Sequence, residues 1–483
     1  MTLTGILAFG AAALLLGLAP ESPRWSRVRS WGILVANVAA LFMLQPAVPI
    51  RYLDFWFPAA SLALSALGWA VSRPKGAAVG REPVYTGLAV GGMVLVMSLP
   101  RYLGDYAPGL CCLTATRPPQ ILPVAAVVLV SAGMVVGTLR LGSGRKGWLW
   151  AVFGLVLLLF VVLKSAPLSV LVSTWLRELG NQSTTLAKAS DLRWLGFSYI
   201  AFRILHTVRD RQNGRFAALS LREYISYVTF FPALTAGPID RAERFNKDLQ
   251  KPAGDTASRL AEGGARIAVG LLKKFAVADT LALIALSENN YAQVTSTGWM
   301  WLLLYAYALR IYFDFSGYTD IAIGLGRLLG IRLPENFDRP YLKPNLTLFW
   351  NSWHMTLAQW FRSYFFNPLT RALRTLPKPL PTSVIILLGQ ASTMILIGLW
   401  HGVTWNFLIW GAWHGLGLFL HSRWLELYRA RFSQVVLPAG LQRGLTWLGT
   451  FLTFNYVALG WAWFALPQTG QSWTVLLKLF GWS

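Results

Sequence analysis

The sequence predicts an all-α polytopic membrane protein with about twelve transmembrane helices and additional re-entrant or interfacial segments. Three observations carry this prediction. Hydrophobic residues make up 55% of the 483 residues, and the mean hydropathy is +0.48. Charged residues make up 13%, about half of the roughly 25% typical of soluble domains. Long apolar runs recur along the chain. This composition excludes a disordered chain, a disulfide-rich scaffold and an ordinary cytosolic enzyme.

The apolar runs reach the length needed to cross a membrane, which is about 20 residues at 1.5 Å per residue. The first run follows no basic residue and shows no clean cleavage site, so we expect a retained helix and not a signal peptide. The 23 tryptophans suit a chain with many membrane–water interfaces. In chain order, the predicted spans are Leu3–Ala19, Trp31–Ala47, Phe55–Val71, Pro83–Leu99, Ile121–Leu139, Trp148–Leu163, Trp194–Val208, Gly264–Leu286, Trp299–Phe315, Ser383–Leu399, Val403–Leu420 and Thr446–Leu466.

The formal charge is +23, and the basic residues lie between the apolar runs. They therefore indicate the topology of the chain and contact with anionic lipid headgroups, and we expect no nucleic-acid partner. One set of early loops carries nine basic residues and the other set carries three. By the positive-inside rule, this predicts that the first set is cytoplasmic and that the N-terminus lies outside. The first set is Arg24, Arg27, Arg29, Arg73, Lys75, Arg81, Arg140, Arg145 and Lys146. The second set is Arg51, Arg101 and Arg117.

The two cysteines, Cys111 and Cys112, are neighbours in the sequence. Neighbouring cysteines rarely bond to each other, and the chain offers no second pair. The sequence therefore predicts neither a disulfide framework nor a zinc site.

Two stretches interrupt the helical pattern in the middle of the chain. Residues Tyr224–Ile239 are cut by Pro232, Gly237 and Pro238, and Thr319–Ile331 is short and rich in glycine. Broken backbone at membrane depth survives only where it is buried in protein or lines a wet cavity. We therefore predict re-entrant or interfacial segments that build a site; a plain structural kink is the alternative.

Histidine supplies the candidate chemistry, because an ionisable group inside a membrane is costly and signals function by default. His401 ends an apolar run in the sequence Gly-Leu-Trp-His-Gly, where Trp400 can form a pocket wall. A neutral imidazole there is a plausible general base. His414 and His421 are one heptad apart beside tryptophans and resemble packing residues more than catalytic ones. The fifth histidine, His206, is open between a structural and a functional role.

His354 is the second candidate, in the sequence Phe-Trp-Asn-Ser-Trp-His. Asn351 lies three residues before it, so on a helix both side chains would share one face, and Asn351 would orient the imidazole or polarise a carbonyl. We expect the substrate site to be lined by Trp350, Asn351, Trp353, Trp400 and Asp314.

Several further stretches resemble the signature motifs of membrane-bound O-acyltransferases, in the order of that family. The similarity spans roughly residues 195–425 and is greatest to the bacterial branch of alginate O-acetylases and teichoic-acid D-alanyl transfer proteins. The stretches are Phe230–Ile239, Gly270–Asp279, Tyr312–Gly324, Pro334–Tyr341 with Phe349–His354, and Gly398–Gly402.

The resemblance implies a bundle of helices around a funnel with a thinned centre. His401 would be the catalytic histidine and His354 the second motif histidine, near the tunnel. We expect N-terminal transmembrane helices at 1–165, a catalytic core at 190–425, and a loop and transmembrane helix at 426–483. Alongside Asn351, His354 would stabilise an oxyanion or orient the donor.

The implied activity is transfer of an acyl group, most simply acetyl, from a cytoplasmic thioester to a hydroxyl of a cell-envelope polysaccharide or glycolipid. The donor would be acyl-CoA or an acyl-carrier thioester, attracted by Lys273, Lys274, Arg241 and Arg244; ordinary positive-inside residues are the alternative interpretation of these four. No bound cofactor or metal is expected. The implied location is the inner (cytoplasmic) membrane, with an accessory envelope protein as a partner. Two alternatives stay open: D-alanyl transfer to teichoic acid from a carrier protein, and a non-enzymatic transporter or flippase of a lipid-linked glycan.

Overall fold

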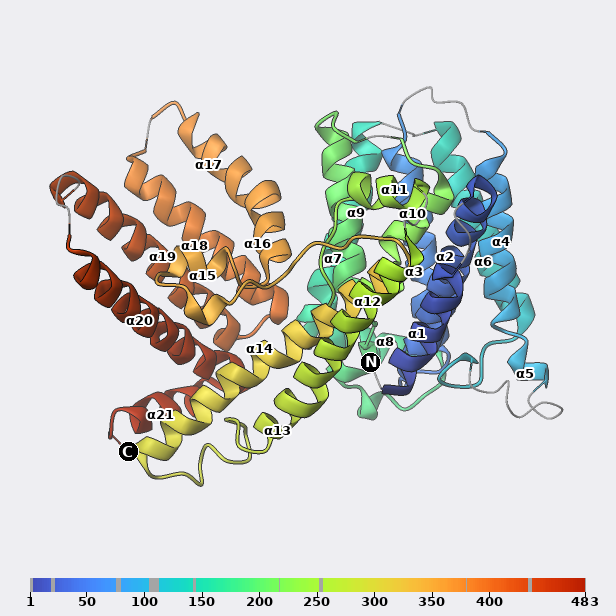
Figure 1. The fold of residues 1–483 in the computed structure, drawn as a ribbon. Helices are drawn as coiled ribbons and strands as arrows, with labels where there is room; N and C mark the ends of the chain where they lie inside the picture. The colour runs from blue at the N-terminus through green and yellow to red at the C-terminus, as the bar shows by residue number, and fades with distance from the viewer. Residues whose placement is uncertain are drawn as a thin grey trace. The chain divides into compact units, whose positions relative to one another are not determined.

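The computed structural model describes residues 3–18, 22–74, 80–103, 113–141, 145–216, 218–251, 255–378, 380–432 and 437–482. Within these ranges the chain is helical and forms no strand (Figure 1), which confirms the predicted all-α class. The predictions for Lys75, Cys111 and Cys112 fall outside the described residues.

In the described part of the chain, thirteen α-helices precede residue 297 and eight begin at or after it. The first group is α1 Leu3–Gly17, α2 Pro23–Leu44, α3 Leu53–Ser72, α4 Glu82–Val96, α5 Pro100–Leu103, α6 Ile121–Leu141, α7 Lys146–Lys164, α8 Ala166–Leu179, α9 Phe197–Gln212, α10 Leu221–Val228, α11 Ala242–Gln250, α12 Thr256–Leu271 and α13 Asp279–Ala282. The second group is α14 Thr297–Leu328, α15 Leu346–Trp350, α16 Met355–Phe361, α17 Asn367–Arg374, α18 Thr382–His401, α19 Trp405–Phe432, α20 Ala439–Ala465 and α21 Thr469–Leu479. Short 3-10 turns and two π-helical segments, η5 Leu272–Ala278 and η7 Arg362–Phe366, complete the set.

Six helical segments of the described chain are long and apolar enough to cross a membrane. They are Trp25–Leu44, Leu53–Ser72, Glu82–Leu103, Ile121–Leu141, Lys146–Lys164 and Thr382–His401. In α6 the protein buries only Val124 and Thr138. An apolar surface of that extent is stable in lipid and costly in water. The chain is thus a multi-pass membrane protein, while the count of about twelve spans stays a prediction.

The chain forms two compact units. The first contains residues 1–267 and 321–333, and the second contains 268–320 and 334–483. In the first unit α3 packs against α2, α6, α7, α9 and α10. Fully buried Trp69 of α3 donates its Nε1 hydrogen to the carbonyl of Leu219, at 2.9 Å. The indole is thus held in the core with its polar atom satisfied. The expected division at 165, 190 and 425 stays a prediction.

The first interrupted stretch is irregular, as predicted. Helix α10 ends at Val228, a 3-10 turn covers Phe231–Ala233, and the chain then runs without helix to Arg241. A helix end leaves carbonyl groups without partners. Buried Arg203 of α9 donates to the carbonyls of Val228 and Ala233, at 2.9 and 2.8 Å. The broken backbone is therefore stabilised by a side chain from a neighbouring helix.

Helix α8 carries polar residues on its protein-facing side. Ser169, Ser173 and Arg177 are spaced by four residues, so they share one face, and all three are buried. The large apolar side chains Leu171, Trp175 and others on α8 are exposed. This distribution is the inverse of that in a soluble protein, and it suits a helix that turns its apolar face to lipid.

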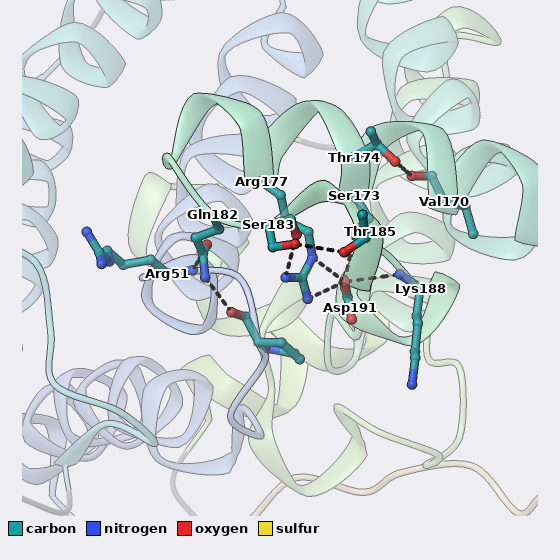
Figure 2. Close-up of polar contacts among 11 residues, drawn as sticks. Arg51, Val170, Ser173, Thr174, Arg177, Gln182, Ser183, Thr185, Lys188 and Asp191 are labelled. Atoms are coloured by element: carbon teal, nitrogen blue, oxygen red, sulfur yellow. Dashed lines mark hydrogen bonds and ion pairs between the residues drawn. The ribbon is translucent and has the colours of Figure 1, made fainter.

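Asp191 binds the polar face of α8 (Figure 2). Its Oδ2 accepts hydrogen bonds from Ser173 Oγ at 2.7 Å and from Arg177 Nε at 2.9 Å. The backbone N–H of Lys188 donates to the same atom, at 3.2 Å. Burial acts to raise the pKa of Asp191, but these hydrogen bonds and the Arg177 charge outweigh it and lower the pKa. Asp191 thus anchors the segment that follows α8 as a carboxylate.

The second interrupted stretch, Thr319–Ile331, does not form a separate re-entrant segment, so that prediction was wrong. It is the end of the 32-residue helix α14, which continues to Leu328. A single glycine inside a helix costs only about 1 kcal/mol. Gly324 and Gly326 therefore do not interrupt the helix, and the preceding span Trp299–Phe315 belongs to the same element.

In the second unit, α18 and α19 form a close antiparallel hairpin joined by residues 402–404 (Figure 1). A Cβ atom on Gly411 of α19 would lie 2.6 Å from the carbonyl oxygen of Met394 and 2.7 Å from the Cα of Ile395. Only a glycine permits such close approach of two helix backbones. Helix α19 also packs against α15, α20 and α21.

Candidate active site

His401 is the last residue of α18, at the tip of the hairpin with α19. Its ring is surrounded by aromatic side chains. The ring centroids of Trp400 and Phe464 lie at 4.4 and 4.7 Å, and those of Phe407 and Trp410 at 5.7 and 5.8 Å. The His401 side chain remains partly exposed. It is therefore an imidazole in a largely apolar wall that retains access for a ligand.

His354 lies between the short helices α15 and α16 and is 3% exposed. Its backbone φ is +41°, a left-handed conformation that is uncommon for a residue with a side chain. Asn351 follows the end of α15, so the two residues do not share one helix face as predicted. The turn between α15 and α16 separates them. Strained backbone of this kind occurs most often at functional sites.

Trp400 connects the two candidate histidines. Its ring centroid lies 6.1 Å from that of His354 and 4.4 Å from that of His401. Phe315 of α14 also meets the ring of His354 edge-on, with centroids 4.7 Å apart. The structure thus brings His354, Trp400 and His401 into one continuous aromatic cluster of the second unit.

The other predicted tryptophans adjoin this cluster in different ways. Trp350 contacts Trp410 and His414, at centroid distances of 5.8 and 5.2 Å. Trp353 lies 5.2 Å from Trp461 and 5.8 Å from Phe349. Both indoles are buried. Trp350 therefore extends the wall near His401 through Trp410, whereas Trp353 belongs to the adjoining aromatic core.

Asn351 and Asp314 are bonded to basic side chains. Asn351 is exposed, and its Oδ1 accepts a 2.6 Å hydrogen bond from Arg362 Nη2. Asp314 of α14 accepts a 2.5 Å bond from Lys274 Nζ. These contacts hold both side chains in place, and they do not show whether either side chain binds a substrate. Their predicted substrate-binding roles stay predictions.

Lys273, Lys274 and Arg244, which belong to the cations expected to attract the donor, each bond to a carboxylate. Lys273 bonds to Asp320 at 2.6 Å, Lys274 bonds to Asp314, and Arg244 contacts Asp240 at 2.6 Å. Each pair reduces the local positive field. Burial raises the pKa of Asp240 to about 6, an effect that the Arg244 charge partly offsets.

The sequence patterns assigned no role to three residues that the structure places around the histidines. Asn336 is fully buried and contacts His354, while Trp410 and Phe464 contact His401. Asn336 lies in the motif Pro334–Tyr341, and its place in that motif was a signal that could have identified it. Phe464 comes from α20, and no pattern in the sequence links it to position 401.

The cluster offers two imidazoles, a buried amide and a water-poor aromatic setting. Such a site suits proton transfer to or from a substrate hydroxyl, because charges and hydrogen bonds act more strongly where water is excluded. Among the residues that the structure describes, no three His, Cys, Asp or Glu side chains gather in a group that could hold a metal ion.

Comparison with known proteins gives a match over the region that contains this site. The family model described as MBOAT, the membrane-bound O-acyltransferase family, matches residues 146–460. That range holds every helix from α7 to α19 and most of α20.

Individual relatives are similar over shorter or longer parts of the chain. A teichoic acid D-alanyltransferase of Streptococcus thermophilus is 30% identical over 360 residues, which are 72% of this chain and 83% of the relative. A probable alginate O-acetylase of Azotobacter vinelandii is 35% identical over 292 residues, 59% of this chain and 53% of the relative. A peptidoglycan O-acetyltransferase of Helicobacter pylori is 31% identical over 264 residues, 54% of this chain and 46% of the relative. The chain thus matches about half the length of the two acetyl-transferring relatives.

Proposed function

The chain belongs to the membrane-bound O-acyltransferase family, and we propose that it moves an acetyl group to a cell-envelope polysaccharide or glycolipid. The donor is a thioester, acyl-CoA or an acyl carrier, reached from the cytoplasmic side. Relatives named as acetyltransferases of alginate and of peptidoglycan support an envelope acceptor. The membrane is the inner (cytoplasmic) one.

The observation that carries the proposal is the shared aromatic cluster of His354, Trp400 and His401. Two histidines 47 residues apart in the sequence are held in one site by one indole. A purely structural role for the motif would not require a partly exposed imidazole at the hairpin tip. The arrangement supports His401 as the base and His354 as the group that orients a substrate.

The reaction then follows from these positions. His401 accepts the proton of the acceptor hydroxyl, whose oxygen forms a bond to the carbonyl carbon of the thioester. The carbon–sulfur bond breaks, and the proton held by His401 passes to the departing thiolate. General base catalysis of this kind contributes about 10²–10⁴-fold. Fixing donor and acceptor in one site supplies much of the remaining acceleration.

A second activity has its own support. The relative that this chain covers to 83% is named as a teichoic acid D-alanyltransferase, so D-alanyl transfer from a carrier protein is the alternative acyl group. The Streptococcus, Azotobacter and Helicobacter relatives are all named as enzymes, and this favours an enzyme over the non-enzymatic transporter or flippase. An accessory envelope protein as a partner is part of the proposal.

Mass spectrometry of purified envelope glycans tests the proposal in cells that carry the wild type, H401A, H421A or no gene. We expect a mass increment in the wild type that H401A and the null strain lack. H421A is the matched control, because His421 bonds to Thr347 Oγ1 at 3.0 Å and lies outside the cluster; it should keep the increment. An acetyl increment supports the first activity and an alanyl increment the second. Retention of the increment in H401A would overturn the role of His401.

A further inference from the structure

The side-chain amide oxygen of Asn336 has three polar neighbours in the turn that carries His354. Its Oδ1 accepts from Thr356 Oγ1 at 2.8 Å, from the Thr356 backbone N–H at 3.2 Å, and lies 3.1 Å from His354 Nδ1. The Asn336 backbone carbonyl also accepts from the N–H of Met355, at 3.0 Å. The turn that carries His354 is therefore fixed against residue 336 by both backbone and side chain.

These contacts determine which way the amide of Asn336 faces. The backbone N–H of Thr356 can only donate, so the atom that it meets must be the amide oxygen. Turning the amide over would place two N–H groups against each other. The oxygen is therefore the atom that faces His354 Nδ1.

The same logic determines the protonation of the imidazole. An amide oxygen can only accept, so Nδ1 of His354 must carry the hydrogen. In a neutral imidazole the other nitrogen, Nε2, then has a free lone pair. Among the described residues, Nε2 of His354 is buried and has no hydrogen-bond partner. Buried polar atoms nearly always have one, and the His354 ring meets Trp400 of the candidate site, so the open position at Nε2 suits a ligand or water.

We propose that Asn336 is a positioning residue, which holds neutral His354 with Nε2 ready to accept a hydrogen bond from an O–H or N–H group of the substrate. The hydrogen bond from a substrate to Nε2 rests on the proposed function, whereas the contact between Asn336 and His354 does not. It also specifies the role of His354. A neutral ring without a hydrogen on Nε2 cannot donate to an oxyanion, so His354 orients a substrate hydrogen and does not stabilise the oxyanion through that atom.

Nitrogen NMR of the purified protein with ¹⁵N-labelled histidine tests the geometry without using the reaction. We expect the His354 ring, assigned by the loss of its signals in H354Q, to show a protonated Nδ1 and an unprotonated Nε2. N336A removes the acceptor, and the ring should shift toward the tautomer with hydrogen on Nε2. A protonated Nε2 in the wild type, or an unchanged ring in N336A, would overturn the inference.

N406A provides the matched control for the loss of a buried asparagine. Asn406 is 2% exposed and lies in the same unit, and its amide bonds to the carbonyl of Leu466 and to Ser472. We expect N406A to lower stability and to leave the tautomer of His354 unchanged. A tautomer shift in N406A equal to that in N336A would assign the effect to general loosening and overturn the positioning role.

N336D keeps the test open if N336A does not fold. An aspartate still accepts from Thr356 and His354, and its charge favours the protonated imidazole. We expect acyl transfer to persist with its acidic limb moved to higher pH, whereas N336A loses about tenfold or more in kcat. An unmoved limb in N336D would contradict the inference. Loss of transfer in H401A is a separate result, so failure of the proposed function and failure of this inference can be told apart.

Discussion

Gly317 of α14 lies directly against the backbone around Gly270. A Cβ atom on Gly317 would be 2.9 Å from the Gly270 carbonyl oxygen and 2.9 Å from the backbone nitrogen of Lys274. Asp314 and Asp320 stand three residues before and after Gly317, and they bind Lys274 and Lys273. The lysines belong to the π-helical segment η5. One glycine contact flanked by two ion pairs therefore fixes this crossing.

Replacement of Gly317 by alanine should destabilise the protein by about 1–3 kcal/mol, because backbone atoms must move to admit the methyl group. Gly264→Ala on α12 is the control, since no neighbouring atom lies within 4 Å of its Cβ position. There the higher helix propensity of alanine should leave stability unchanged or raise it. Thermal unfolding in one detergent compares the two. Equal melting temperatures for both variants would contradict the close-packing argument.

The two ion pairs should differ in their contribution to the stability of the protein. The Asp320 side chain is 5% exposed, whereas that of Asp314 is 50% exposed. Removing a cation from a buried carboxylate costs more than removing one from an exposed carboxylate. We expect Lys273→Met to lower stability by about 2 kcal/mol and Lys274→Met by less than about 1 kcal/mol. Melting temperatures of both variants check this order, and a larger loss in Lys274→Met would reverse it.

Asp240 should make stability depend on pH. Burial raises its pKa to about 6 in the folded protein, from an ordinary value of 3.8. The folded state then holds this proton more tightly than the unfolded state. The contribution of Asp240 to the free energy of unfolding is therefore full below about pH 4 and declines as the pH rises to about 6.

Asp240→Asn removes that titration, while its amide oxygen can still accept from the backbone N–H of Arg241, a bond of 2.6 Å in the wild type. We expect the melting temperature of the wild type to fall relative to the variant between pH 4 and pH 6. Glu243→Gln, at an exposed position of the adjacent helix, controls for the loss of one negative charge. Parallel pH curves for the wild type and Asp240→Asn would refute the prediction.

His414 should be structural. Its ring is fully buried against Trp350 and Trp410, and among the described residues neither ring nitrogen has a hydrogen-bond partner. Replacing buried polar atoms that lack partners by an apolar group of similar volume is neutral or stabilising, because it removes their desolvation cost. His414→Leu should keep or raise the melting temperature and keep acyl transfer, whereas His414→Ala should lose about 2–4 kcal/mol of stability through the cavity. Loss of transfer in a folded His414→Leu would show a chemical role.

Composition and the long apolar runs were sufficient to predict the fold class, because both report directly on burial in lipid. Boundaries were less predictable. The spans predicted as Gly264–Leu286 and Trp299–Phe315 became α12 with η5 and the long helix α14. Glycine content alone does not distinguish a helix break from a close crossing such as that of Gly317. Short amphipathic helices such as α8 also escaped prediction, because their buried side is polar.

The candidate site was predictable in part. The motifs located His354 and His401, and the structure places both against Trp400. Helical spacing suggested Asn351 as the partner of His354, but His354 has a left-handed backbone conformation, so the two residues are not on one helix. The partner is Asn336, which precedes it by 18 residues. Sequence spacing describes neighbours within one helix, and this contact is made between two loops.

The hairpin of α18 and α19 has a consequence for how the protein is made. Three of the four aromatic neighbours of His401, namely Trp400, Phe407 and Trp410, lie within nine residues of it. Contacts between residues near in sequence form early, because little loop entropy opposes them. Two helices joined by three residues can pack against each other as soon as both are synthesised. The surroundings of His401 are then largely assembled when the hairpin forms, and only Phe464 has to await the translation of α20.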